Sequence, residues 1–189
     1  FTNTINFDYN DGVNNQLETR DLSGEGVAPA SLTITETNPY DYGLQANGSS
    51  TLHTFTVTNT GSVPATSVTE ITLATPFNYE GGGYPGTTGT CGSIINAGAT
   101  CDLVIAFEPI ANGTFNSSIQ MDYNDGVNTQ ASILLVTGRA ANPALLTITD
   151  APSYNFPDVA TGGNVTRLFT ITNTGGVEAT ALLSSGLAA

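Results

Sequence analysis

Hydrophobic and polar residues alternate with a period of two along several short stretches of the chain. Between Thr51 and Asn59, Phe55 and Val57 fall on one side of an extended backbone and the intervening threonines fall on the other. This alternation is typical of a half-buried antiparallel strand. No stretch shows the three-and-four spacing of an amphipathic helix, so the pattern predicts an all-β protein.

Six stretches, each bounded by clusters of Gly, Pro or Asn, predict the strands of the fold, and several of them alternate in this way. They are Ser31 to Thr37, Thr51 to Asn59, Ser67 to Leu73, Thr100 to Phe107, Thr114 to Tyr123 and Thr129 to Gly138. The segment from Asn78 to Gly92 is rich in glycine and contains Pro85. This composition predicts a long loop.

The chain also repeats itself at an offset of 114 residues. Three segments recur in order and without a gap: Asp8 to Asn14 as Asp122 to Asn128, Leu32 to Thr35 as Leu146 to Thr149, and Phe55 to Gly61 as Phe169 to Gly175. Collinear matches at a single offset indicate a tandem array. A unit of this size suits an immunoglobulin-like antiparallel β-sandwich.

The repeat divides the chain into three parts. Residues 27–140 form one complete module, residues 1–26 are the terminal strands of a preceding module, and residues 141–189 are the first strands of a following one. A partial sandwich exposes an apolar face and unpaired strand edges, so the two outer parts are not expected to fold alone. We expect neighbouring material to complete them, either by covalent continuation of a longer array or by strands donated from adjacent copies, which gives a head-to-tail fibre.

The charge balance excludes several classes of partner. The chain contains 16 acidic residues against three arginines and no lysine, for a formal net charge of -13. Such a surface repels nucleic acid and anionic membrane. No apolar run approaches the roughly 20 residues that cross a bilayer, so no membrane insertion is expected in this part of the protein. The absence of lysine also excludes a Lys-to-Asn isopeptide bond.

Two cysteines, Cys91 and Cys101, flank a short stretch rich in Gly and Ala. A metal site needs more ligands than this region offers. The pair therefore predicts a disulfide that closes a small loop, with two free buried thiols as the alternative. A disulfide indicates an oxidising compartment, and we expect an extracellular location at the cell surface.

The framework residues resemble a known family. They are Phe55 to Gly61, the pair Cys91 and Cys101 followed by Ile105 to Pro109, and the hairpin Asp122 to Gly126. Together they resemble the Hydin-type (ASH) immunoglobulin-like repeats, and they are similar to those of bacterial surface proteins called choice-of-anchor D proteins. The resemblance implies a sandwich of seven or eight strands in exported, often very long proteins, and it carries over no catalytic residue.

The single histidine, His53, would have to serve any Ser-His-Asp or Cys-His arrangement. Its counterpart one repeat later is Arg167. A position that exchanges His for Arg between copies is most simply a solvated strand end. We therefore expect no catalytic residue and no enzyme activity.

The Asp-Tyr-Asn-Asp-Gly-Val-Asn segments allow two interpretations. Oxygen ligands at alternate positions can hold calcium, although the spacing departs from the EF-hand pattern. Asn-Asp-Gly between two strands is also ordinary hairpin chemistry, in which Gly126 takes a positive φ. We expect the turn, no metal and no cofactor, with calcium as the alternative.

These features together predict a structural repeat unit of an extracellular bacterial cell-surface fibre or stalk. Its partners are then other copies of itself or adjacent modules, head to tail. The alternative is an adhesin or carbohydrate-binding module that reads a surface glycan or protein with the loops at one sandwich end. Tyr79, Tyr84 and the glycines at 81 to 83 are the best patch for that role.

Overall fold

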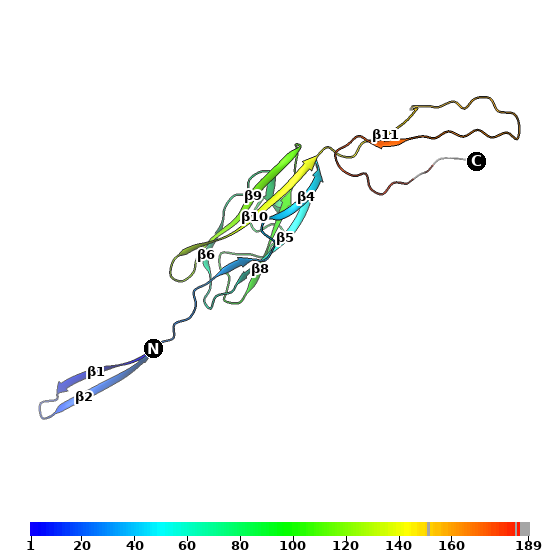
Figure 1. The fold of residues 1–189 in the computed structure, drawn as a ribbon. Helices are drawn as coiled ribbons and strands as arrows, with labels where there is room; N and C mark the ends of the chain where they lie inside the picture. Colours follow the sequence, from blue (N-terminus) through cyan, green and yellow to red (C-terminus); the bar gives the residue numbers. More distant parts are fainter. Residues whose placement is uncertain (151, 184, 186–189) are drawn as a thin grey trace.

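The computed structural model describes residues 1–150, 152–183 and 185. Strands β1 (Thr2–Asn10) and β2 (Asn15–Ser23) form an N-terminal hairpin, and β11 (Leu146–Ile148) pairs with β12 (Ile171–Asn173) near the other end. The eight strands between them are β3 (Leu32–Ile34), β4 (Tyr40–Ala46), β5 (Thr51–Asn59), β6 (Thr66–Glu70), β7 (Phe77–Tyr79), β8 (Thr100–Phe107), β9 (Gly113–Asn124) and β10 (Thr129–Ala141). They form a sandwich from which the two terminal segments extend at opposite ends (Figure 1).

The sandwich consists of two four-stranded sheets. One has the order β4-β10-β9-β6 and the other has the order β3-β5-β8-β7. Neighbouring strands are antiparallel except β4 and β10, which run parallel. A short 3-10 helix, Glu80–Gly82, follows β7. The prediction of an all-β, immunoglobulin-like sandwich is therefore confirmed, with the eight strands that the family resemblance allows.

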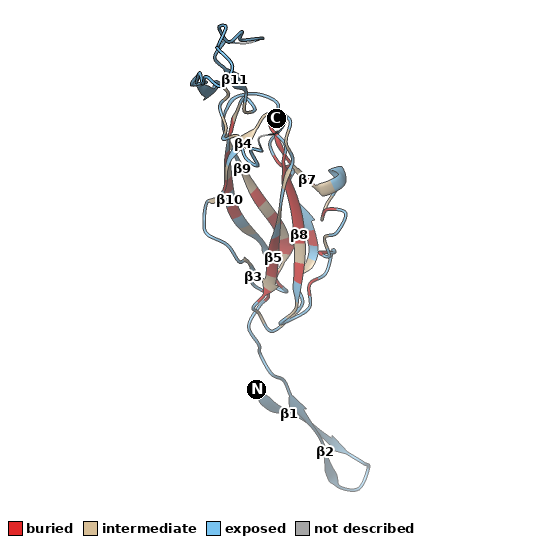
Figure 2. Ribbon diagram, turned by 90° about the vertical axis from the view of Figure 1, so that its right-hand side faces the viewer, coloured by how far each residue is buried: buried red, intermediate tan, exposed pale blue. Residues whose placement is uncertain are grey.

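The core lies between the two sheets, where buried residues line the inner faces (Figure 2). Phe55 and Val57 of β5 are fully buried, as the alternation in that strand predicts. Strand β8 is buried along most of its length, and Ile119 and Met121 of β9 meet it from the other sheet. All members of the core cluster lie between Ala30 and Val136. Residues 30–136 therefore enclose their own hydrophobic core.

The structure corrects the predicted elements at several places. Strands β5 and β8 have the predicted bounds, but β3 is only three residues long, and β4 and β7 were not predicted. Strand β4 does alternate, with Tyr40, Tyr42 and Leu44 at every second position, but turn residues obscure it, since Pro39 precedes it and Gly43 within it takes a φ of 74°. Strand β7 and the 3-10 helix lie in or next to the segment predicted to be only a loop.

The terminal hairpins match parts of the sandwich at the repeat offset. Strands β1 and β2 correspond to β9 and β10, and both pairs are antiparallel. Ile5, Phe7 and Tyr9 are exposed in β1, whereas the corresponding residues of β9 are buried. Likewise Leu146 pairs with Asn173, as Leu32 pairs with Asn59. Apolar residues of the terminal segments are thus exposed, whereas the residues at the corresponding positions of the sandwich are buried.

Candidate functional site

The point where the chain enters the sandwich is organised around one side chain. Asn59, the last residue of β5, is 0% exposed. Its Nδ2 donates to the carbonyls of Val63 (2.9 Å) and Ile95 (3.0 Å). Its Oδ1 accepts from the backbone N–H groups of Ser31 (3.1 Å) and Gly61 (3.0 Å). A single buried amide therefore joins the incoming chain, the β5–β6 turn and the segment before β8.

The same arrangement recurs 114 residues later around Asn173. The Nδ2 of Asn173 donates to the carbonyl of Val177 (2.8 Å), and its Oδ1 accepts from the N–H groups of Leu145 and Gly175 (3.0 Å each). The interaction with Ile95 has no counterpart there, because the repeat places its equivalent beyond Ala189. The same hydrogen-bonding pattern is thus built twice, around an asparagine, at an offset of 114 residues.

The turns after Asn59 and Asn173 also pack closely against the chain that leads into each segment. We call these two places the junctions. A Cβ on Gly61 would lie 2.1 Å from the carbonyl oxygen of Pro29, and one on Gly175 would lie 2.1 Å from that of Pro143. The N–H of Ser62 donates to the carbonyl of Ala28, and the equivalent N–H, 114 residues on, donates to Asn142. Glycine is required at both turns because the incoming backbone occupies the side-chain position.

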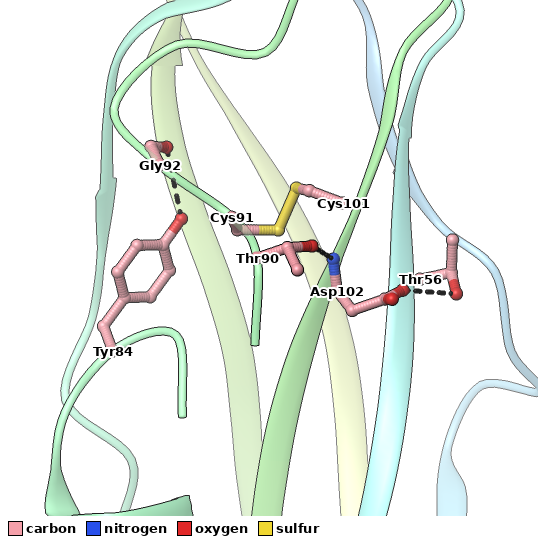
Figure 3. The surroundings of a disulfide bond; sticks show 7 residues. All are labelled: Thr56, Tyr84, Thr90, Cys91, Gly92, Cys101 and Asp102. Atoms are coloured by element: carbon pink, nitrogen blue, oxygen red, sulfur yellow. Dashed lines mark hydrogen bonds between the residues drawn. A yellow bond between two sulfur atoms is a disulfide. The ribbon is translucent and has the colours of Figure 1, made fainter. Parts of the chain in front are cut away.

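The structure joins Cys91 and Cys101 in a disulfide, and both residues are buried (Figure 3). Cys101 lies in β8, and Cys91 ends the loop that runs beside it. The N–H groups of Thr90 and Cys91 donate to the carbonyl of Asp102, and the N–H of Asp102 donates to Oγ1 of Thr90 (2.9 Å). The Asp102 carboxylate in turn accepts from Oγ1 of Thr56 in β5. The bond therefore attaches the loop to the middle of a sheet.

His53 does not occupy the solvated strand end that the sequence predicted. Its side chain is 26% exposed and stacks on the ring of Tyr40, with 4.0 Å between ring centroids. Nδ1 lies 2.8 Å from the hydroxyl of Tyr40, and Nε2 lies 2.7 Å from Oε1 of Glu36. The prediction failed because both partners belong to the segment around β4, a strand that was not predicted.

The repeat reproduces this cluster with different chemistry. Arg167 replaces His53, Asp150 replaces Glu36 and Tyr154 replaces Tyr40. The Arg167 guanidinium lies 2.6 Å from Oδ2 of Asp150 and 4.9 Å from the centre of the Tyr154 ring. An acid, an aromatic ring and a nitrogen base therefore recur as a unit. This recurrence indicates a framework role for His53.

Replacing His53 by Ala should lower the free energy of unfolding by about 1–2 kcal/mol, because one ring stack and two hydrogen bonds are lost. Replacing it by Arg should recover most of that loss, since Arg pairs with an acid and a tyrosine at the equivalent position. Urea denaturation of the two variants at pH 7 measures the difference. An Ala variant as stable as the unmodified protein would contradict a framework role.

The Asp-Gly-Val-Asn loop between β9 and β10 is a tight turn held by hydrogen bonds to the side chain of Asp125. Gly126 takes a φ of 96°. Asp125 is buried, its Oδ1 accepts from the N–H groups of Val127 and Asn128, and its Oδ2 accepts from Gln130. The two backbone donors, of Asn128 and then of Val127, lower the pKa of the Asp125 carboxyl. Its oxygens are occupied within the turn rather than free for calcium.

The N-terminal hairpin repeats this turn with Gly12 at a φ of 99° and Asp11 as the acceptor. Within residues 1–150, 152–183 and 185, no group of three or more His, Cys, Asp or Glu side chains could hold a metal ion. In the same ranges no helix is long and apolar enough to cross a membrane.

The patch proposed from sequence for ligand binding is internal only in part, because the glycines at 81 to 83 are exposed. Tyr79 is only 6% exposed and belongs to the core, whereas Tyr84 is half-buried. The two rings meet edge to face, with 5.6 Å between centroids. Neither lies in a loop at a sandwich end, because Tyr79 is part of β7 and Tyr84 follows beside the disulfide loop (Figure 3).

The fold, the disulfide and the repeated junction define an immunoglobulin-like framework module. The family model for the HYDIN/CFA65/VesB-like, Ig-like domain matches residues 34–138, and the chain belongs to this family. The resemblance stated from the framework residues is therefore confirmed. The comparison with curated proteins finds no significant match.

Solved structures similar to this chain are distant. The Vibrio cholerae VesB protease aligns with a TM-score of 0.47 at 12% identity, over 59% of this chain and 32% of the protease. The ASH/PapD-like domain of human CEP192 aligns with a TM-score of 0.40 at 9% identity, over 65% of this chain and 92% of that domain. The secreted serine protease VesC from Vibrio cholerae aligns with a TM-score of 0.40 at 15% identity, over 58% and 23%. The chain thus spans about a third of the VesB chain.

Proposed function

We propose that the chain is part of a head-to-tail array of immunoglobulin-like modules that forms an extracellular stalk or fibre at a bacterial cell surface. The observation that carries the proposal is the junction built twice, around Asn59 and around Asn173. The chain also reaches the sandwich at one end and leaves it at the other (Figure 1). Modules joined in this way follow one another along a line, and each contacts only its neighbours.

Two properties support the extracellular location and the structural role. The buried disulfide is a bond that forms and persists in oxidising compartments. The single histidine is held by Glu36 and Tyr40 in a cluster that the repeat rebuilds with Arg, so it contributes to the framework rather than to a reaction. The array therefore acts through its length and stiffness, without catalysis.

The array can be assembled in two ways, by covalent continuation of a longer chain or by strands donated from adjacent copies. The β1–β2 hairpin supplies counterparts of β9 and β10, and residues 141–189 correspond to residues 27–75.

The array is tested by small-angle X-ray scattering on chains that contain one, two and four copies of residues 27–140, a range that encloses its own core. Strand β10 has 13 residues, so each added module should lengthen the particle by about 40 Å. A maximum dimension that rises linearly with copy number supports the proposal. A dimension that rises only with the cube root of the mass would show that modules collapse on one another and would overturn it.

A further inference from the structure

An opening into the sandwich lies on the side where β6 and β7 are the outer strands of their sheets. It is a hollow of about 160 Å³. Its lining includes two tyrosines, a carboxylate, an amide and a hydroxyl: Tyr79, Tyr84, Glu70, Asn78 and Thr72. Polar groups thus converge on one hollow together with apolar side chains, which is the usual arrangement of a small ligand site.

The hydroxyl of Tyr79 is buried and has no hydrogen-bond partner among the described residues. Other buried tyrosines of the core are satisfied. The hydroxyl of Tyr42 donates to the carbonyl of Ile105 at 2.9 Å, and that of Tyr123 accepts from the N–H of Leu32 at 3.1 Å. An unpaired buried hydroxyl is costly, so Tyr79 leaves one hydrogen-bonding position to be filled by a water or by a ligand.

The surrounding charges restrict what that partner can be. Burial raises the pKa of Tyr84 to about 12, with a further contribution from the Glu70 carboxylate, and the same two causes raise the pKa of Tyr79. Both hydroxyls therefore stay protonated. The arginines of the chain are Arg20, Arg139 and Arg167, and none of them lines the hollow. An anionic ligand would meet Glu70 without a compensating cation.

The two remaining groups call for opposite hydrogen-bonding roles. The Glu70 carboxylate only accepts hydrogen bonds, whereas the orphan hydroxyl of Tyr79 needs an acceptor for its proton. A cation would satisfy Glu70 but offers no acceptor to Tyr79. A ligand that carries hydroxyl groups supplies both, since each hydroxyl donates and accepts. The half-buried ring of Tyr84 adds an apolar surface beside them.

We propose that this hollow binds a neutral polyhydroxylated ligand, in the form of one sugar ring at the end of a glycan. Tyr79 donates to a ring hydroxyl, Glu70 accepts from a neighbouring one, and Tyr84 covers the apolar face of the ring. This site lies on the side of the module, away from the junctions, so it goes beyond the proposed array and is independent of it.

The test is saturation-transfer difference NMR on the unmodified chain with the methyl glycosides of glucose, galactose, mannose and N-acetylglucosamine, each measured separately. At least one should receive saturation from the protein. Replacing Tyr79 by Phe removes only the hydroxyl and should weaken that binding roughly fivefold, the effect of one hydrogen bond. Tyr42→Phe is the matched control, because it removes a hydroxyl that is satisfied inside the core, and it should leave binding unchanged.

Thermal unfolding separates binding from stability. Tyr79→Phe should melt at or above the temperature of the unmodified protein, whereas Tyr42→Phe should melt about 4 °C lower because a satisfied hydrogen bond is lost. The proposal is overturned if none of the four glycosides binds or if Tyr79→Phe binds them unchanged. Binding of n-butylammonium in place of the glycosides, abolished by Glu70→Gln, would also overturn it in favour of a cationic ligand.

Discussion

Replacing Asn59 by Asp should lower the free energy of unfolding by about 4 kcal/mol at pH 7. The two side chains have nearly the same shape, so packing is unchanged. The substitution removes both Nδ2–H donors and turns a carboxylate oxygen toward the carbonyls of Val63 and Ile95. It also places a charge where the residue is 0% exposed, with no cation beside it.

Urea denaturation at pH 7 and pH 3 checks this expectation. Protonation of the new carboxyl at low pH removes the charge and restores one donor, so the difference from the unmodified protein should shrink at pH 3. Asn173→Asp is the matched control, because Asn173 makes the counterparts of three of these four hydrogen bonds but is exposed. Its effect should stay within about 0.5 kcal/mol. A loss below 1 kcal/mol for Asn59→Asp would contradict the central role of this amide.

Loss of the Cys91–Cys101 bond should lower the free energy of unfolding by about 3 kcal/mol, the chain entropy of a loop of this length. The loss of stability should be local to the disulfide loop rather than spread over the whole sandwich. The loop is attached to β8 by the disulfide and by the hydrogen bonds of Thr90 and Cys91 to Asp102 (Figure 3). Reduction should therefore release residues 78–101 before the β9–β10 ladder opens.

Hydrogen exchange followed by mass spectrometry, with and without a reductant, measures this order of release. The double variant Cys91→Ala, Cys101→Ala should match the reduced protein and respond no further to reductant. Uniform exchange across the sandwich after reduction would contradict the local attachment. Two free thiols in the non-reduced protein would contradict the bond itself.

The strands that local pattern predicts are those with residues buried on one face or along most of their length. Alternation at Phe55 and Val57 located β5, and the apolar run of β8 located its partner, because burial directly controls which residues occupy these positions. Strand β4 was missed although Tyr40, Tyr42 and Leu44 alternate along it, because Pro39 before it and Gly43 within it are turn residues.

The same limit applies to the sites. The disulfide could be predicted because two cysteines leave few options. The role of Asn59 could not be predicted, since Asn-Thr-Gly after a strand is typical of an exposed turn and the four partners of the amide come from three separate segments. Tyr79 was expected at the surface because glycines follow it, but β7 turns its ring into the core.

The direction in which the chain enters and leaves the sandwich has a mechanical consequence. Strand β3 lies antiparallel to β5 beside the incoming chain, and β10 carries the chain out at the far end (Figure 2). A pulling force along a row of modules therefore acts parallel to the strands. It loads the hydrogen bonds of the β3–β5 and β4–β10 ladders together, in shear, instead of opening them one after another.

Asn59 lies at the point where that force first reaches the module, because its amide holds the N–H of Ser31 immediately before β3. The disulfide lies elsewhere, between β8 and its neighbouring loop, and carries none of the tension directly. A tether made of such modules would keep its length under load through backbone ladders and one buried amide. Reduction of its disulfides would release the loop beside β8 in each module before it weakened the β3–β5 and β4–β10 ladders that carry the force.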